Sequence, residues 1–382
     1  MIDIPESFAP GLYIHIPFCR SRCRYCGFPT SDQSDTGRIS RYLDAVIMEL
    51  HGVAPGWNRF DSLYLGGGTP SIVSLPELER LVESVNRHVK LAMNLEFTME
   101  VNAGDVSRES VAAWTSFGVN RISLGVQALD DRALHLLGRR HTSAQALEAV
   151  AIIQEAGVAL GIDLIFGYPG QTQSDWVRTL DHVASLHPDH LSCYQMTVET
   201  GTEMAQQITS GELIPATQDQ EASLFRITHD HLTRRGYDHY EISNYAADAG
   251  RMARHNTKYW FRIPVLGIGA AAHSFDGRRR WCNAPNAESY WLDIESGRSP
   301  IVNTESLNTV DETIESIFLG IRTRWGFPCD RLPPGAGSDG RIRAMRDAGW
   351  IREDHGRITA TDEGFAVADA IAEVIIAAAG YV

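Results

Sequence analysis

The chain has 382 residues, 43% of them hydrophobic and 21% charged, enough for a large core and two or three domains. Its net charge of −14 excludes a general nucleic-acid binder and a polybasic membrane anchor. No apolar run reaches the roughly 18 residues of a membrane span, and no export signal opens the chain. The sequence therefore predicts a cytoplasmic protein.

Strands and helices alternate up to about residue 198. The predicted strands are 12–16, 62–65, 96–101, 121–126, 162–166 and 191–196, and the predicted helices are 38–51, 76–89, 109–117, 131–137 with 144–156, and 174–186. Six such units in series imply a parallel sheet with right-handed crossovers. Because eight units would close a barrel, six predict an α/β fold built on a partial (β/α)6 TIM-like barrel, open on one side.

Three cysteines follow the first predicted strand at C-x3-C-x2-C spacing, namely Cys19, Cys23 and Cys26. Thiolates in such a group favour soft-metal chemistry, and iron–sulfur clusters are normally held by four of them. Three ligands leave one iron open, and a ligand with an amine and a carboxylate could chelate it. A structural zinc site completed by His15 is the alternative, as are three unrelated thiols.

Polar residues stand at or near the ends of the next strands. The run Gly66-Gly-Gly-Thr-Pro70 follows the second strand, and its amides predict an anion-binding nest or a tight turn. Glu100 suits a ribose diol or an amine, and Arg139 can clamp a carboxylate. Gln127 ends the fourth strand, and Asp163 needs a partner inside an apolar strand. Together they predict one binding face, although each alone also fits an ordinary ion pair or strand end.

The cysteine spacing, with Tyr25 before the last cysteine, resembles the signature of radical S-adenosylmethionine (SAM) enzymes. The run Tyr13-Ile-His-Ile-Pro-Phe-Cys19 resembles the HemN/HemW family in particular. The resemblance implies a (β/α)6 partial barrel and a [4Fe-4S] cluster whose open iron binds SAM. One electron then cleaves SAM to methionine and a 5′-deoxyadenosyl radical.

The resemblance also implies roles for residues that match family positions. Tyr13, Gly67 and Glu100 match contacts to the cluster-bound SAM, and Tyr25 matches an aromatic residue packed on adenine. A further set matches SAM contacts, some of them to a second molecule: Gly68, Thr69, Gln127, Arg139 and Asp163. The sequence leaves open whether one or two SAM molecules bind.

One position separates two branches of the family. The HemN branch has a further cysteine two residues after the third cluster cysteine, where this chain has Phe28. This pattern looks like the HemW branch, as do Tyr240-Glu-Ile-Ser-Asn-Tyr245, Arg254-His-Asn-Thr-Lys-Tyr-Trp260 and Gly267-Ile-Gly-Ala-Ala-Ala-His273. HemW proteins are regarded as haem chaperones. The alternatives are a coproporphyrinogen III dehydrogenase and a HemN-like methyltransferase.

The HemW resemblance implies haem as cargo, an apo-haemoprotein as recipient, peripheral membrane contact through that recipient, and a homodimer. Imidazole is a common axial ligand, so His255 is the candidate iron ligand, beside the flat surfaces of Tyr259 and Trp260. A hydrogen-bonded core histidine is the alternative. His273 and Cys282 are weaker candidates for the iron, and the run 278–280 supplies cations for propionates or a solvated surface.

The C-terminal half changes character. A helix is predicted over 221–235, a short strand over 240–243, and a linker rich in proline and glycine over 333–338. Helices over 341–348 and 364–379 flank a hairpin of strands 350–352 and 357–359. We therefore predict three parts: the radical SAM partial barrel (1–200), an extension that closes the barrel (201–330), and a winged-helix-like module (331–382). The acidic charge favours a structural or docking role for this module over nucleic-acid binding.

Overall fold

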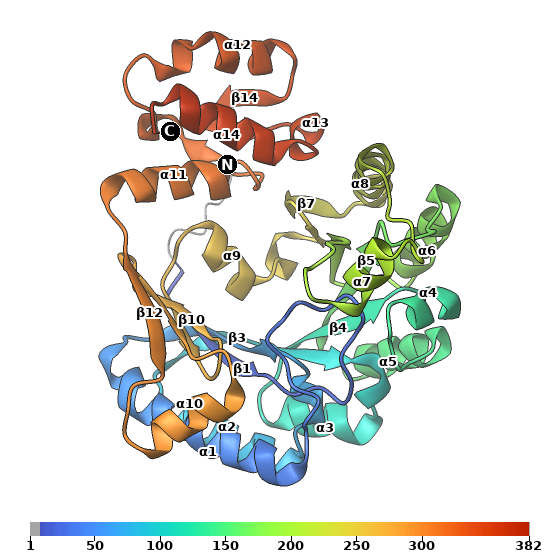
Figure 1. The fold of residues 1–382 in the computed structure, drawn as a ribbon, viewed down its shortest axis with the longest axis vertical. Coiled ribbons are helices and arrows are strands. Elements are labelled where there is room, and N and C mark those ends of the chain that lie inside the picture. Colours follow the sequence, from blue (N-terminus) through green and yellow to red (C-terminus); the bar gives the residue numbers. More distant parts are fainter. Residues whose placement is uncertain (1–7, 382) are drawn as a thin grey trace.

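The structure is a computed structural model that describes residues 8–381, so the first seven residues and Val382 lie outside the described part. A twelve-stranded sheet with the order β12-β11-β10-β9-β1-β2-β3-β4-β5-β6-β8-β7 runs through the molecule, and a three-stranded sheet belongs to the C-terminal module (Figure 1). None of the helices within residues 8–381 combines the length and apolarity needed to cross a membrane.

Six parallel strands in chain order form the middle of the large sheet, as predicted. They are β1 (Gly11–Ile16), β2 (Phe60–Gly67), β3 (Leu91–Asn102), β4 (Arg121–Gln127), β5 (Ala159–Phe166) and β6 (His190–Gln195). Each pairs in parallel with the next. Such a sheet is covered on both faces, so its strands are nearly continuous apolar runs; β2, for example, is buried from Phe60 to Gly66.

The connecting helices are also those expected from the sequence. They are α1 (Thr36–Val53), α2 (Leu75–His88), α3 (Arg108–Ser116), α4 (Asp131–Leu136), α5 (Ser143–Glu155) and α6 (Gln173–Ser185). In Figure 1, α1, α2 and α3 lie on the outer face of the sheet. Side chains that accept from first-turn amides fix several helix starts. The N-cap of α6 is Thr172, which forms a capping box with Asp175, so this helix begins one residue before the predicted start at 174.

The extension lengthens the sheet at both edges. After α7 (Glu203–Thr209) and α8 (Gln218–Thr233), the hairpin of β7 (Asp238–Glu241) and β8 (Asn244–Ala246) pairs antiparallel with β6. The chain then crosses to the other edge, where β9 (Val265–Ile268) pairs in parallel with β1. The strands β10 (His273–Phe275), β11 (Arg279–Asn283) and β12 (Ile301–Ser306) follow antiparallel, with α10 (Ala287–Glu295) between the last two.

The crossing segment is the short helix α9 (Arg254–Trp260), which packs against the N-terminal ends of β1 to β3. The carboxylate of Glu96 accepts the backbone N–H groups of Arg254 and His255, both over 2.8 Å. The fully buried ammonium of Lys258 pairs with Asp61 at the start of β2. These contacts place α9 at the end of the strands opposite to the cysteines.

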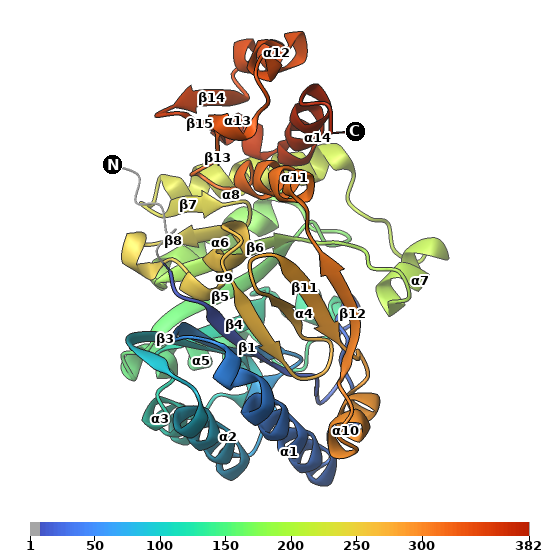
Figure 2. The same ribbon diagram turned by 90° about the vertical axis from the view of Figure 1, so that its left-hand side faces the viewer.

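The C-terminal module has its own core, formed by residues such as Ile317, Phe327, Ile342 and Ile371. Its elements are α11 (Thr309–Gly320), β13 (Phe327–Pro328), α12 (Gly340–Asp347), β14 (Ile351–Asp354), β15 (Arg357–Ala360), α13 (Asp362–Phe365) and α14 (Ala368–Ala378). Figure 2 shows the module at one end of the molecule. The predicted hairpin is present, but the core begins in α11, before residue 331. The helix predicted over 364–379 is interrupted after Phe365, where residues 366–367 form a turn between α13 and α14.

Candidate functional site

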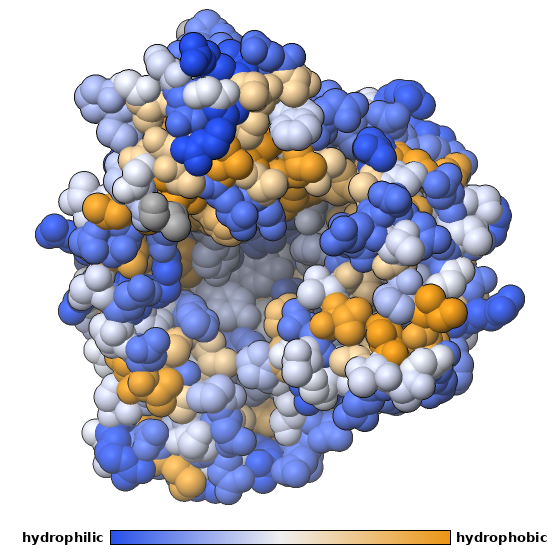
Figure 3. Space-filling view, turned by 45° about the horizontal axis from the view of Figure 1, so that its top comes forward, coloured by the Kyte–Doolittle hydropathy of each residue, from blue (hydrophilic) through white to orange (hydrophobic). Residues whose placement is uncertain are grey.

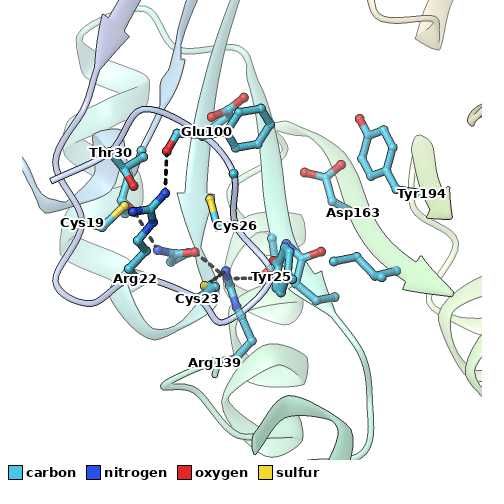
Figure 4. Close-up of a pocket in the computed structure, with 18 of the residues that line it drawn as sticks. Cys19, Arg22, Cys23, Tyr25, Cys26, Thr30, Glu100, Arg139, Asp163 and Tyr194 are labelled. Carbon is cyan, nitrogen blue, oxygen red and sulfur yellow. Dashed lines mark hydrogen bonds between the residues drawn. The ribbon is translucent and has the colours of Figure 1, made fainter. Parts of the chain in front are cut away.

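A cavity of about 540 Å³ lies where the cysteine loop meets the C-terminal ends of the parallel strands. Most of the site residues expected from the sequence line it: Cys19, Cys23, Tyr25, Cys26, Gly67, Gly68, Thr69, Glu100, Gln127, Arg139 and Asp163. Figure 4 shows the labelled cysteines on one side of the cavity and Asp163 with Tyr194 on the other. The structure therefore brings these residues together around one cavity at the strand ends.

The cysteine loop is held by backbone hydrogen bonds and by donors to its sulfur atoms. The Cys19 N–H donates to the Ser31 carbonyl over 2.8 Å, which closes the base of the loop. The Thr69 hydroxyl donates to Cys19 Sγ, and Arg139 Nη1 donates to Cys23 Sγ, both over 3.4 Å. Burial and the neighbouring thiols raise the pKa of Cys19 and Cys26. Metal coordination deprotonates such thiols outright.

The three thiols are not arranged around one common ion in the described part of the chain. In the described part of the chain, no three His, Cys, Asp or Glu side chains could jointly hold one metal ion. The thiol ligands of a multi-iron cluster bind different irons, so they stand further apart than ligands of one ion. No group of three ligands that includes His15 is present in residues 8–381, so the zinc alternative finds no support. Nδ1 of this buried imidazole lies 2.9 Å from the Tyr13 hydroxyl, and its Nε2 has no hydrogen-bond partner among the described residues.

The glycine run is a tight turn in which two amides are already occupied. The Gly67 N–H donates to Glu100 Oε2 over 2.9 Å, and the Gly68 N–H donates to the Ile16 carbonyl over 2.8 Å. The occupied amides of Gly67 and Gly68 match the tight-turn alternative. The glycines are needed for close approach instead, since a Cβ on Gly68 would lie 2.8 Å from the Phe18 carbonyl oxygen.

Glu100 is the most strongly perturbed carboxyl group of the cavity. Burial raises its pKa to about 7, although the Tyr64 hydroxyl and the Gly67 amide, which donate to it, oppose the shift. The nearby charge of Asp163 raises the pKa further. A carboxyl group that titrates near neutral pH and faces a cavity is typical of binding and catalytic sites.

Arg139 joins the cysteine loop to the strand ends. Besides Cys23, its guanidinium donates to Asn102 Oδ1 and to the Gly125 carbonyl, and Asn102 in turn donates to the Thr69 hydroxyl over 3.0 Å. The side chain of Asn102 thus ties Arg139 to Thr69. Sequence reasoning missed Asn102, although it lies two residues beyond Glu100 and hence on the same face of β3.

Two further strand-end residues carry signs of a functional site. Gln127 has a left-handed backbone with a φ of 67°, which is a strained conformation for glutamine. Asp163 accepts from the Ser123 hydroxyl over 2.8 Å, while its buried Oδ1 has no partner within residues 8–381. Asp163 therefore has the partner that the sequence demanded, and one oxygen remains for a ligand. Tyr64, Ser123 and Tyr194, which also line the cavity, carry no local sequence signal.

The two tyrosines assigned through the resemblance lie in different places. Tyr25 lines the cavity and packs against an apolar cluster that contains Met196. Burial raises its pKa, so the phenol stays protonated. Tyr13 does not line the cavity. Its ring centre lies 6.0 Å from the ring centre of Tyr64, and Tyr64 does line the cavity.

His255 is a buried residue with both ring nitrogens engaged. Nδ1 lies 2.9 Å from the Ser62 hydroxyl and Nε2 lies 3.1 Å from the Tyr259 hydroxyl. Burial and the charge of Lys258 lower its pKa to about 3, so the imidazole is neutral. This arrangement matches the core-histidine alternative, and a role as iron ligand stays a prediction.

The weaker haem candidates lie at the β9–β12 edge, away from the cavity. His273 and Cys282 face each other across β10 and β11, so the structure brings these two together. In the run 278–280, Arg279 pairs with Asp276 and Arg280 with Glu315. Two of the three cations proposed for propionates are therefore already neutralised.

Comparison with known proteins identifies the family. The sequence pattern that defines the radical SAM superfamily matches residues 13–183 of this chain. A Mycobacterium tuberculosis protein named heme chaperone HemW is 32% identical over 371 residues, which cover 96% of this chain and 94% of that protein. The chain belongs to the HemW branch of the HemN/HemW family of radical SAM proteins.

Other relatives extend the comparison. The heme chaperone HemW of Synechocystis is 33% identical over 84% of this chain and 80% of its own length. The coproporphyrinogen III oxidase HemN of Escherichia coli superposes with a TM-score of 0.84 over 98% of this chain and 91% of its own, at 22% identity. That likeness shows the fold and confirms a radical SAM partial barrel with a C-terminal extension.

Proposed function

We propose that this HemW-branch protein is a haem chaperone that binds haem and passes it to apo-haemoproteins. The observation that carries the proposal is the match, over nearly the whole chain, to bacterial proteins named heme chaperones at 31–33% identity. Phe28 supports it, because the HemN branch has a cysteine at this position. The recipient, its membrane contact and a homodimer belong to the same proposal.

The cofactors of the proposal are a [4Fe-4S] cluster and SAM in the strand-end cavity. Cys19, Cys23 and Cys26 would hold the cluster, which supplies one electron and an open iron for the SAM amine and carboxylate. Thr69 and Arg139 would donate to the sulfur ligands, as they do now. A second SAM molecule remains a prediction.

Several cavity groups would bind and orient SAM. The Glu100 carboxylate, fixed by Tyr64 and Gly67, suits a ribose diol or an ammonium group. The free oxygen of Asp163, on β5, offers a second acceptor. Tyr25 supplies an aromatic face for adenine.

His255 remains the proposed iron ligand of the resemblance, but the function does not depend on it. Iron could reach Nε2 only after the Tyr259 hydroxyl had left it. That exchange would break a buried hydrogen bond, which contributes about 1 kcal/mol net to the stability of the fold. A haem chaperone with another ligand is equally compatible with the family assignment.

The experiment is anaerobic. The cluster is reconstituted, haem is titrated while the Soret band is followed, and transfer to the apo-form of a b-type haemoprotein is measured. A parallel sample receives SAM, a reductant and coproporphyrinogen III, and mass spectrometry searches for decarboxylated or methylated product. Haem binding and transfer without product support the chaperone. No haem binding overturns it, and decarboxylated product would identify a coproporphyrinogen III dehydrogenase instead.

A further inference from the structure

A short excursion of the chain lies against the cysteine loop. Between β6 and α8 the chain runs out to α7 and back, and Figure 2 shows α7 standing away from the sheet. We call residues 201–211, which contain α7, the strap. The Met204 N–H in the strap donates to the Arg24 carbonyl over 2.9 Å. Because Arg24 lies between Cys23 and Cys26, the strap contacts the loop between two of its cysteines.

The helix α7 depends on the cysteine loop for its own stability. It has seven residues, and isolated helices shorter than about 12 residues are marginal in water. Amides in the first turn of a helix have no partner inside that helix. The Thr202 hydroxyl accepts the Ala205 amide, and the Arg24 carbonyl accepts the Met204 amide. The loop therefore caps the helix, so that order in one favours order in the other.

The buried side chain of Met204 is the main attachment of the strap. It is fully buried in an apolar cluster that also contains Leu137, and Tyr25 of the cysteine loop packs against the same cluster. An ion pair between Arg24 and Glu203, over 3.2 Å, joins the same two segments. The Glu203 side chain is 54% exposed, and exposed pairs of this kind contribute little. Apolar burial of Met204 therefore outweighs the ion pair.

The cysteine loop is held between the strap and the barrel. On the barrel side, the Arg24 N–H donates to the carbonyl of Leu137, at the end of α4, over 3.2 Å. Gly138 permits this approach, since a Cβ there would lie 3.0 Å from Arg24 Cγ. One peptide segment of the loop is thus fixed on one side by α4 and on the other by α7. Removing the strap would leave only the contact to α4.

Glycines at both ends of the strap allow it to swing. Gly201 and Gly211 have φ angles of 85° and 79°, and nothing lies within 4 Å of a Cβ at either position. Hinges are a few loop residues that absorb large backbone rotations. An outward swing would uncover Tyr25, which lines the cavity together with the cysteines. Figure 3 shows this face of the molecule hollowed, with hydrophobic surface on parts of the rim.

We propose that the strap is a latch for the cysteine loop. Closed, it holds the segment from Cys23 to Cys26 in the arrangement that retains the [4Fe-4S] cluster; open, it frees this segment and the cluster is lost. The coupling is reciprocal, because a bound cluster fixes the cysteines and with them the Arg24 carbonyl that caps α7. This inference rests on the cluster of the proposed function and is independent of haem binding.

The first test uses the full-length wild type under anaerobic conditions, with and without the reconstituted cluster. Hydrogen–deuterium exchange at the Met204 amide, followed by mass spectrometry, is expected to be about tenfold slower with the cluster, a usual size of coupling between two sites. Amides of α3, on the outer face of the sheet, are the control and should not change. Equal exchange at Met204 in both states would overturn the latch. A wild type that forms no cluster would instead overturn the cofactor assignment.

The second test measures cluster loss in excess EDTA from the decay of the visible absorbance. Met204→Ala keeps the amide but removes the buried side chain, and we expect it to lose the cluster about tenfold faster than the wild type. Met204→Leu keeps the apolar volume and should stay near the wild-type rate. Met93→Ala, at a fully exposed methionine of β3, is the matched control. A wild-type rate in Met204→Ala, or the same acceleration in Met93→Ala, would overturn the latch. If Met204→Ala does not fold, the exchange at Met204 in the wild type decides.

Discussion

The guanidinium of Arg139 lies 3.4 Å from the sulfur of Cys23, although the two residues are 116 positions apart. The same guanidinium donates to Asn102 and to the Gly125 carbonyl, so it spans the cysteine loop, β3 and β4. One side chain thus sets the distance between the cluster ligands and the strand ends that would bind SAM.

Arg139→Lys should weaken SAM binding without removing the cluster. Lysine keeps the charge but has no planar fork, so it cannot reach three acceptors in fixed directions. We expect SAM to bind about tenfold more weakly, measured by calorimetry on reconstituted protein, with iron content unchanged. Arg140→Lys, at the exposed neighbouring position, is the control. Wild-type SAM affinity in Arg139→Lys would show that the fork does not position the site.

Replacing Cys19, Cys23 or Cys26 by alanine should abolish the cluster, because each would ligate a different iron. Iron, acid-labile sulfide and visible absorbance after anaerobic reconstitution measure the loss. Cys282→Ala, a half-buried cysteine on β11, should leave all three unchanged. A triple variant that still bound nearly stoichiometric iron would contradict the assignment.

Glu100→Gln should change how stability depends on pH. The folded-state pKa of about 7 lies above the usual 4.5, so between these values the folded protein keeps a proton that the unfolded chain has lost. Wild-type stability should therefore fall, relative to the variant, by roughly 2 kcal/mol as pH rises from 4.5 to 7. Urea unfolding of the apo-protein measures this. Glu241, whose pKa burial also raises to about 7, is present in both proteins and cancels. A pH-independent difference would refute the shift.

The sequence predicted the parallel strands and the cysteine site because both depend on local signals. Apolar runs such as 162–166 end at turn residues, and the three cysteines lie within eight positions. Glu100 and Asp163 could be assigned to one face because parallel strands end at the same edge of a sheet. Elements that depend on local patterns were therefore predictable, and the hairpin of the C-terminal module is another example.

Contacts between distant residues account for what was missed. The amide of Gly67 is occupied by Glu100, 33 positions away, so the glycine run could not be distinguished from an anion nest. Glu96 holds the start of α9 from 158 positions away, which places His255 at the far end of the strands. The extension places β8 beside β6 at one edge of the sheet and β9 beside β1 at the other. These pairings also join strands that are far apart in the sequence.

Gly67→Ala should be much more harmful than Gly170→Ala. Both glycines have a positive φ, 113° and 79°, which alone costs alanine about 1 kcal/mol. A Cβ at Gly67 would also lie 2.4 Å from the His15 ring, whereas nothing lies within 4 Å of one at Gly170. We expect Gly67→Ala to lose roughly 3 kcal/mol of unfolding free energy in urea titrations. Equal losses in the two variants would show that His15 moves aside.

The buried pair of Lys258 and Asp61 provides the test for how α9 is fixed. Lys258 is fully buried and also donates to the Ala9 carbonyl over 2.7 Å. Lys258→Met leaves the Asp61 carboxylate buried without its counter-ion, which should cost roughly 3 to 5 kcal/mol of unfolding free energy. The double variant Lys258→Met with Asp61→Asn removes both charges and should recover much of that loss. Cluster content should be unchanged in both, because α9 lies at the opposite end of the strands from the cysteines. Loss of the cluster in the single variant would show that α9 supports the cysteine site through the barrel.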